Sequence, residues 1–267
     1  MISINTLVKN EENFLWYSVG SVVNYVDEIL LWDTGSTDQT LKIIEEIIKR
    51  YPHKIHFKQI GRVDPEEYSG VRQQMLDNSI GDWVFILDGD EVWWDENIKK
   101  ISSFINSNKV YESVVVKTYN LIGDMFHFQE ENAGMYRFGK RRGHFALRFM
   151  NKNIPGLHVG DVYGKEGFFD GDGLPIQNRD ESKIMFFDLA YVHATHLTRS
   201  TKDFEVMQRD KKKKYERGIE FAGDFYFPEV FFREKPEIVP NNWENTQLGF
   251  KVKAYLQTPL KKIKRRI

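Results

Sequence analysis

Cysteine is absent from this sequence of 267 residues. Disulfide frameworks, thiol nucleophiles and zinc sites built on thiolates are therefore excluded, and the absence fits the cytosol. An excess of one charge is also missing, because 38 basic residues stand against 39 acidic ones. The net charge of −1 creates no overall field for nucleic acid, so we expect no nucleic-acid partner.

Long apolar runs are missing as well. No stretch approaches the length of a transmembrane helix, and the first residues lack the charged start and apolar core of a signal peptide. We therefore expect a cytoplasmic protein, either soluble or peripheral to a membrane. With 41% hydrophobic and 29% charged residues, the composition is that of a globular chain able to bury a sizeable core.

The first hundred residues alternate between apolar runs of strand length and amphipathic stretches. Strands are predicted at residues 2–8, 28–32, 55–60 and 83–87. Helical apolar faces are predicted within residues 14–26, 41–51, 71–75 and 98–105. Strands and helices that alternate at this spacing form βαβ units, so we predict an α/β fold with a mainly parallel sheet flanked by helices.

The pattern changes after about residue 106. Further strands are predicted at residues 113–118, 145–150 and 184–193, with glycine-rich acidic loops at 156–173. Residues 201–217 look helical and strongly basic. We divide the chain into residues 1–105 and 106–200, as two halves of one domain, and a helical C-terminal extension at residues 201–267.

The predicted strand at 83–87 ends at three acids, Asp88, Asp90 and Glu91. Buried carboxylates are costly unless they are compensated, so we expect them where the strand leaves the sheet. In open α/β sheets, ligands bind in the crevice outside the carboxyl ends of the strands. A hard divalent cation that carries diphosphate oxygens suits such a cluster. The alternative is a strand that ends in an acidic, solvated turn.

Three segments together resemble the family 2 glycosyltransferases of the GT-A fold: TLVKNEE at residues 6–12, DTGSTDQT at 33–40 and DWVFILDGDE at 82–91. The resemblance implies a Rossmann-like mixed sheet in which residues 1–105 bind a nucleotide-diphosphate sugar and residues 106–200 bind the acceptor. It also implies inversion at the anomeric carbon. Thr34 departs from the family pattern, which often has a second aspartate there.

The resemblance assigns roles to four acids. It implies that Asp33 hydrogen-bonds the nucleotide base, that Asp88 faces the ribose and metal-bound water, and that Asp90 binds the metal directly. Glu91 is expected to assist catalysis from beside them. For Asp33 the alternative is an aspartate that only forms the turn.

Two arginines and two histidines complete the expected donor site. Arg72 and Arg199 are candidates to meet the base or the diphosphate, with exposed surface arginines as the alternative. His193 and His196 follow the strand at 184–193, where the family often supplies a further metal ligand. Imidazole is a more usual ligand for Mn²⁺ than for Mg²⁺. His193 is favoured because it directly ends the apolar run, but either residue could instead be a core or surface histidine.

Sugar transfer with inversion also needs a base for the acceptor hydroxyl, and a carboxylate is the expected group. We choose Asp161, with Glu166, Asp170 and Asp172 as competitors. The expected enzyme is a hexosyltransferase that uses Mn²⁺ or Mg²⁺ and a donor such as a UDP- or GDP-linked sugar. Its acceptor is a glycan, a lipid-linked saccharide or a protein.

Two alternatives remain open. A nucleotidyltransferase would also use a metal and an α/β sheet, but such enzymes usually carry a glycine-rich loop after the first strand, and residues 7–12 contain no glycine. A non-catalytic sugar- or nucleotide-binding module has little need for the acids Asp88 and Asp90.

Residues 260–267 carry five basic residues among eight, with Leu260, Ile263 and Ile267 at helical spacing. This pattern predicts a short basic amphipathic end that lies on the inner face of a membrane, since each cation adds about 1 kcal/mol near a charged leaflet. The alternative is a solvated, frayed terminus.

Overall fold

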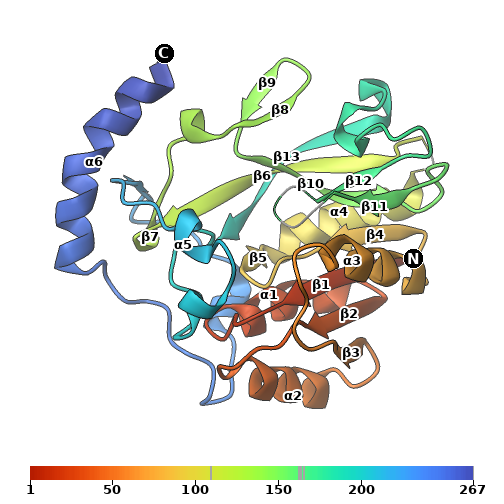
Figure 1. The fold of residues 1–267 in the computed structure, drawn as a ribbon, viewed down its shortest axis with the longest axis horizontal. Coiled ribbons are helices and arrows are strands. Elements are labelled where there is room, and N and C mark those ends of the chain that lie inside the picture. The colour runs from red at the N-terminus through yellow and green to blue at the C-terminus, as the bar shows by residue number, and fades with distance from the viewer. Residues whose placement is uncertain (109, 162–163, 165, 267) are drawn as a thin grey trace.

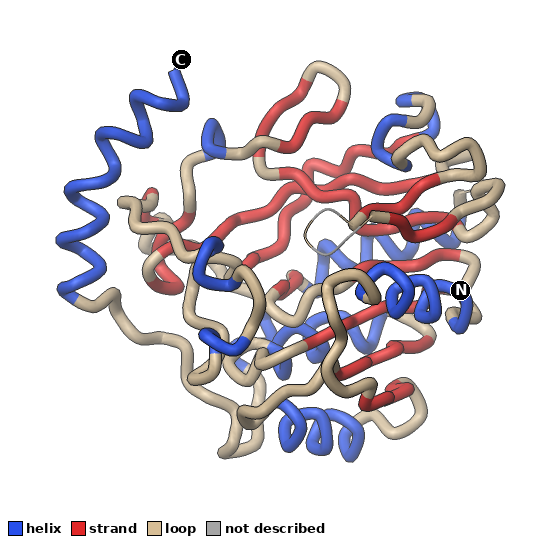
Figure 2. The backbone as a smooth tube through the Cα atoms, viewed as in Figure 1, coloured by secondary structure: helices blue, strands red, loops and turns tan. Residues whose placement is uncertain are grey.

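The computed structural model describes residues 1–108, 110–161, 164 and 166–266. A ten-stranded sheet forms the centre of this part of the chain, with helices packed around it (Figures 1 and 2). Its main path runs β14-β7-β6-β10-β4-β1-β2-β3, and β5 and β13 pair beside that path. The predicted fold class, a mixed sheet flanked by helices, is confirmed.

The first half of the chain supplies a parallel block. It consists of β1 (Ile2–Val8), β2 (Glu28–Asp33), β3 (Ile55–Gln59) and β4 (Trp83–Ile86), in the order β4-β1-β2-β3. Every residue of β1, β2 and β4 is buried. Strands covered on both faces in this way read as continuous apolar runs, which is why the sequence pattern located them.

Helices cover both faces of the parallel block. The side chains of α1 (Leu15–Val22), α2 (Thr40–Arg50) and α4 (Asp95–Ser107) join one large core with Ile4 and Leu31. On the other face, α3 (Tyr68–Asn78) packs Val71 and Met75 against Trp32. This layering leaves the carboxyl ends of β1, β2 and β4 as the open edge of the block.

The second half of the chain is mixed in direction. β10 (Phe145–Asn151) is antiparallel to both β4 and β6 (Ser113–Ile122), and β13 (Ile184–His193) runs parallel to β6. β13 also pairs antiparallel with the short β5 (Glu91–Trp93). β7 (Asp124–Phe128) and β14 (Ile219–Glu220) extend the far edge. Two hairpins stand apart, β8 (Tyr136–Phe138) with β9 (Arg141–Gly143), and β11 (His158–Gly160) with β12 (Gly167–Phe169).

The helix predicted at residues 201–217 is wrong. This segment contains only a 3₁₀ turn at Asp203–Glu205 and the four-residue α5 (Arg209–Lys212). Gln208 adopts a left-handed backbone with φ of 59°, which an α-helix does not accommodate, and the Arg209 side chain is buried. The basic run at 211–214 offers no apolar stripe that would hold a longer helix against the core.

The C-terminal helix is confirmed as α6 (Leu248–Arg266), at the edge of the molecule (Figure 1). The end of the chain is helical through Arg266, where the sequence left a frayed terminus as the alternative, and Ile267 lies outside the described residues. Short 3₁₀ turns complete the inventory: Val23–Tyr25, Glu131–Ala133, Ile176–Asn178, Glu181–Lys183 and Glu229–Phe232. Across the described ranges, no helix is both long and apolar enough to cross a bilayer. The division into three parts stays a prediction.

Candidate active site

The acidic segment lies in the tight turn between β4 and β5. The backbone N–H of Glu91 donates to the carbonyl of Asp88, with 3.2 Å between the heavy atoms. Gly89 lies against Glu11, and a Cβ on this glycine would come within 2.9 Å of the Glu11 Cγ. A side chain at residue 89 would therefore force the turn away from β1. Within this turn Asp90 and Glu91 are buried, whereas Asp88 keeps about a third of its side chain exposed.

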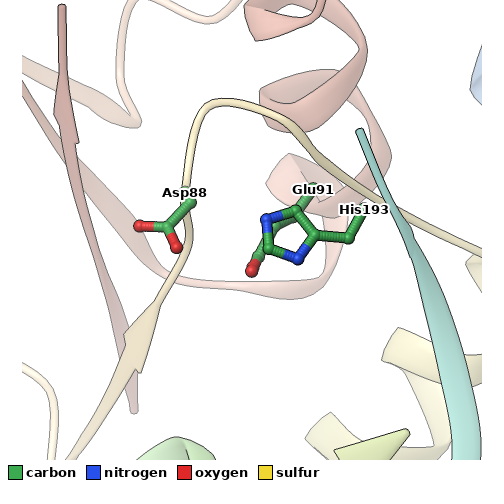
Figure 3. Close-up of side chains that lie close together, drawn as sticks. All are labelled: Asp88, Glu91 and His193. Carbon is green, nitrogen blue, oxygen red and sulfur yellow. The ribbon is translucent and has the colours of Figure 1, made fainter. Parts of the chain in front are cut away.

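Asp88, Glu91 and His193 lie close together (Figure 3). Each offers a ligand atom, and these atoms all lie within 4.8 Å of one another. The sheet register explains the meeting, because His193 on β13 lies opposite Glu91 on β5. Carboxylate oxygens with an imidazole nitrogen form a donor set that suits Mn²⁺. Among the described residues, this cluster fits a divalent cation.

Arg148, on β10, is a site residue that the sequence analysis missed. Its guanidinium contacts Asp88 at 3.3 Å, pairs with Glu91 and donates to the Tyr191 hydroxyl at 3.0 Å. Burial raises the pKa of the Glu91 carboxyl well above its usual value, although Arg148 opposes this effect. Burial acts in the same direction on the pKa of Asp88, but there Arg148 and Arg72 outweigh it and lower the pKa. The pKa values of these two neighbouring acids are therefore shifted in opposite directions.

Asp90 is fully buried and lies beside His193. Its Oδ2 atom lies 2.8 Å from the Arg199 guanidinium and 3.4 Å from the His193 Nε2. Burial alone would raise the Asp90 pKa, but Arg199 and His193 outweigh it and hold the pKa well below its usual range. Asp90 is thus a stable buried anion that shares His193 with the three-residue cluster. Its role as a direct metal ligand stays a prediction.

Arg199 belongs to a second buried charge network, which includes Glu11. Glu11 accepts contacts from Arg199 at 3.2 Å and from Arg209 at 2.5 Å. Arg209 also donates to the carbonyls of Lys9 and Asn10, and these contacts join the segment after residue 200 to the turn after β1. The sequence analysis gave Glu11 and Arg209 no role. The acidic motif at residues 11–12 was the available signal, but nothing local indicated its partners.

Glu11 provides a prediction about pH. Burial raises its pKa to about 7, despite the lowering effect of Arg199 and Arg209. The folded protein therefore binds more protons than the unfolded chain between about pH 4.5 and pH 7, so this group costs stability as the pH rises through that window. We expect the free energy of unfolding of the native protein to fall relative to Glu11→Gln across the window, by up to about 1.4 kcal/mol for each pH unit.

Urea unfolding of both proteins at several pH values measures this difference. The variant Glu46→Gln, at a carboxylate on α2 that pairs with Lys49, serves as a control for the loss of an acid outside the site. A native-minus-Glu11→Gln difference that stays constant or rises with pH would contradict the assignment of the raised pKa to Glu11.

Asp33 ends β2 and organises the loop that follows. Its Oδ2 accepts the backbone N–H groups of Gly35 at 2.9 Å and Ser36 at 3.1 Å. Gly35 has a φ of 88°, a backbone that favours glycine. This is the turn-forming role that the sequence left as the alternative, and the neighbouring Thr34 lines the cleft. Contact of Asp33 with a nucleotide base stays a prediction.

Arg199 is buried at the site and the Arg72 side chain is only 11% exposed, so the alternative of exposed surface arginines is wrong. Arg72 on α3 lies 3.6 Å from Asp88 and stacks over the Tyr68 ring at 5.6 Å. Arg199 joins Asp90 to Glu11, as described above. Both arginines line the same cleft. Their roles toward a base or diphosphate stay predictions.

His196 is buried but lies apart from the three-residue cluster. Its Nδ1 is 2.6 Å from the carbonyl of Lys212, so this nitrogen carries the proton and donates it. Burial, together with the positive charge of Lys214, lowers the pKa of His196 to about 3. The imidazole is therefore neutral, and its buried Nε2 has no hydrogen-bond partner among the described residues. This tautomer is the form that binds metals. Whether His193 or His196 is a ligand stays a prediction.

A cleft of about 980 Å³ opens beside these networks. Asp88 belongs to both the cleft wall and the three-residue cluster. The described part of the wall carries seven cations, which come from the turn after β1, the loop after β3, α3 and the segment after residue 198: Lys9, Arg62, Arg72, Arg199, Arg209, Lys211 and Lys212. Six acids share this part of the wall: Glu11, Asp64, Asp88, Glu166, Glu205 and Asp210. The wall therefore offers basic groups for an anionic ligand beside carboxylates for a cation.

The candidate bases differ in position. Asp161 is exposed, with a φ of 66°, and is not part of the cleft wall, whereas Glu166 is. Asp170 accepts the N–H groups of Asp172 and Leu174 and pairs with Arg179, so its carboxylate holds its own loop. Asp172 is exposed. Asp161 stays the predicted base, with Glu166 as the competitor that faces the cleft.

A model of glycosyl transferase family 2 matches residues 3–162, which is more than half of the chain. The chain therefore belongs to this family, and the resemblance carried by its three motifs is confirmed. A TPR repeat-containing protein of Synechococcus elongatus is 31% identical over 90 residues. That match covers 34% of this chain, and the chain spans about a fifth (20%) of the relative's length.

Solved structures are similar at lower identity. TarS of S. aureus, residues 1–349, has a TM-score of 0.45 and 15% identity, over 73% of this chain and 60% of that chain. Glucosyl-3-phosphoglycerate synthase from Mycobacterium tuberculosis, in complex with Mn²⁺, UDP and glucosyl-3-phosphoglycerate, has a TM-score of 0.47 and 15% identity. There the match covers 78% of this chain and 76% of that chain. Similarity at this level assigns no substrate.

Proposed function

We propose that this family 2 member transfers a sugar from a nucleotide-diphosphate donor to an acceptor hydroxyl, with inversion and with help from a divalent cation. The observation that carries the proposal is the convergence of Asp88, Glu91 and His193 at the wall of a cation-lined cleft. A diphosphate needs both features, because it carries charge that lysine and arginine neutralise and oxygens that a hard cation binds. We expect this activity in the cytoplasm.

The donor's anionic part fits the wall formed by Arg72 and Arg199. Both side chains are held by acids, so their guanidinium groups are positioned before any ligand arrives. Such preorganised charge stabilises a departing diphosphate without further rearrangement. The loop held by Asp33 would meet the nucleoside. UDP- and GDP-linked sugars are the donors that we would test first.

Mn²⁺ or Mg²⁺ would bind through Asp88, His193 and one or both of Asp90 and Glu91. When bound, the cation acts as a Lewis acid on the leaving diphosphate. Arg148 holds Asp88 and Glu91 in place from β10.

Incubation of the protein with Mn²⁺ and a panel of nucleotide sugars tests the proposal, with released nucleoside diphosphate as the readout. Release that depends on the metal and on a particular sugar supports the transferase. Release of pyrophosphate from a nucleoside triphosphate and a sugar phosphate would instead identify a nucleotidyltransferase. Tight binding of nucleotide sugars without turnover, under every acceptor condition tried, would identify a binding module. Glycans, lipid-linked saccharides and proteins are the acceptor classes to supply.

The base can be assigned with two matched variants. If Asp161 is the base, Asp161→Ala lowers kcat for transfer and leaves donor affinity nearly unchanged, whereas Glu166→Ala affects transfer much less. Base catalysis typically contributes about 10²- to 10⁴-fold, so the loss should be of that size. Donor affinity is measured by calorimetry and transfer by product formation. A large loss in Glu166→Ala with little change in Asp161→Ala would move the role to Glu166.

A further inference from the structure

The last helix, α6, presents its apolar side to solvent. Six apolar residues share one face of this helix, and all of them are exposed: Leu248, Val252, Tyr255, Leu256, Leu260 and Ile263. Leu256, Leu260 and Ile263 keep 66%, 64% and 57% of their surface in water. A surface helix normally turns such a stripe inward, toward the core. Here the stripe faces water instead, on a helix at the edge of the molecule (Figure 1).

Polar contacts, small side chains and one aromatic residue hold α6 to the body; the Phe250 ring lies 5.4 Å from the Tyr215 ring. Ala254 and Thr258 are its buried residues, and Thr258 accepts the backbone N–H of Arg217 at 2.9 Å. Arg265 pairs with Glu216 at 2.5 Å and with Glu130 at 2.8 Å. The contacts that hold α6 to the rest of the protein therefore do not use the apolar stripe. The outward orientation follows from these contacts and not from a helix left free.

Lysines border the apolar stripe on both sides. At about 100° per residue, Lys251 and Lys262 fall along one border, and Lys253 and Lys264 along the other. All four are exposed. A wide apolar face between cationic borders is the pattern of a helix that lies in the plane of a membrane interface.

The neighbouring hairpin β8–β9 adds cations to the same region. Arg137, Lys140, Arg141 and Arg142 are all exposed. Glu130, in the segment that leads into β8, pairs with Lys262 and Arg265 of α6 and so ties the two elements together. Residues 135–143 and 248–267 hold 11 of the chain's 38 basic residues and none of its 39 acidic ones. The positive charge is therefore concentrated here in a chain whose net charge is −1.

We propose that α6 and the β8–β9 hairpin form a docking surface for an anionic phospholipid membrane. The apolar stripe would enter the boundary between headgroups and acyl chains, while the lysines and arginines contact lipid phosphates. Charge decides between this occupant and a second copy of the chain. Two copies of α6 have cations and no acids to place against each other, so self-pairing would bring like charges together. The surface is separate from the cation-lined cleft, and the proposal does not depend on the transferase activity.

Sedimentation of the full chain with vesicles tests the proposal. Phosphatidylcholine vesicles that contain phosphatidylglycerol should bind the protein, and pure phosphatidylcholine vesicles should bind it far less. Leu256→Gln/Leu260→Gln/Ile263→Gln should weaken binding at least about tenfold, because each apolar side chain removed from water contributes about 1 kcal/mol or more. The matched control is Ile80→Gln, at an isoleucine that is 66% exposed elsewhere, and it should bind like the native protein. Melting curves check that each variant folds.

The electrostatic part has its own test. Lys140→Gln/Lys264→Gln should weaken binding about 30-fold at low salt, at about 1 kcal/mol per cation. Lys42→Gln/Lys99→Gln, at exposed lysines on α2 and α4, is the control and should change little. Equal binding to both vesicle types, or no binding to the anionic ones, overturns the proposal. A dimer in light scattering that the triple glutamine variant dissociates overturns it as well, in favour of a second copy.

Discussion

Asp90→Asn should abolish measurable turnover while the protein still folds. Loss of a metal ligand removes several kcal/mol of transition-state stabilisation, which corresponds to a decrease in kcat of about 10³-fold or more. Asparagine keeps the size of the buried side chain. Arg199 keeps its contact with Glu11 at 3.2 Å, so it is not left without an acid. Nucleoside diphosphate release, measured across a range of Mn²⁺ concentrations, reports the loss.

The same experiment separates two assignments of the metal site. The motif resemblance assigns a ligand role to Asp90, whereas the geometry groups Glu91 with Asp88 and His193. If Asp90 is the ligand, Glu91→Gln should leave the Mn²⁺ dependence nearly unchanged. Asp188→Asn, at a surface acid paired with Lys117, is the control for a carboxylate far from the site. Near-normal turnover of Asp90→Asn at every metal concentration would show that Asp90 does not bind the metal.

Arg148→Met should cause the largest loss of stability. Methionine keeps most of the apolar length, but Glu91 and Asp88 lose the cation they share. Removing one partner from a buried ion pair typically costs about 3–5 kcal/mol. The cost should be smaller at low pH, because Glu91 can then take up a proton and avoid a buried charge. Chemical denaturation at acidic and neutral pH measures both effects.

Two further variants show whether the ion pair itself is responsible. Arg148→Met/Glu91→Gln should recover part of the stability, because no charge is left unpaired at residue 91. Lys117→Met removes the cation of an exposed pair with Asp188 and should change stability by less than about 1 kcal/mol. A loss in Arg148→Met that is independent of pH and is not reduced by Glu91→Gln would mean that packing, not charge, determines the effect.

Local sequence patterns located most of the regular structure. Continuous apolar runs identified β1, β2 and β4, because strands buried on both faces need no polar alternation. The run at 184–193 was also identified, although β13 is only partly buried. The segment at 201–217 was misread because composition alone suggested a helix. In the structure, the Arg209 side chain reaches into the turn after β1, where it bonds the carbonyls of Lys9 and Asn10.

The acids of the candidate site were also identifiable, since Asp88, Asp90 and Glu91 interrupt a strand that must end there. The residues that contact these acids could not be identified in the same way. Arg148 lies on an ordinary alternating strand, and only the placement of β10 beside β4 brings its guanidinium to the acids. His193 was chosen because it ends a strand, but its meeting with Glu91 depends on the register between β13 and β5.

The sequence by itself therefore determined the family, the α/β class and the place of the acids along the chain. These follow from local burial patterns and short motifs, which depend on residues close together in the chain. Only the tertiary structure decided which charges meet, which carboxyl pKa values are raised or lowered and which side of α6 faces water. Those properties depend on contacts between distant residues, such as Glu11 with Arg199 and Arg209, and on the desolvation that such contacts impose. Neither these contacts nor the desolvation can be derived from the spacing of residues along one segment.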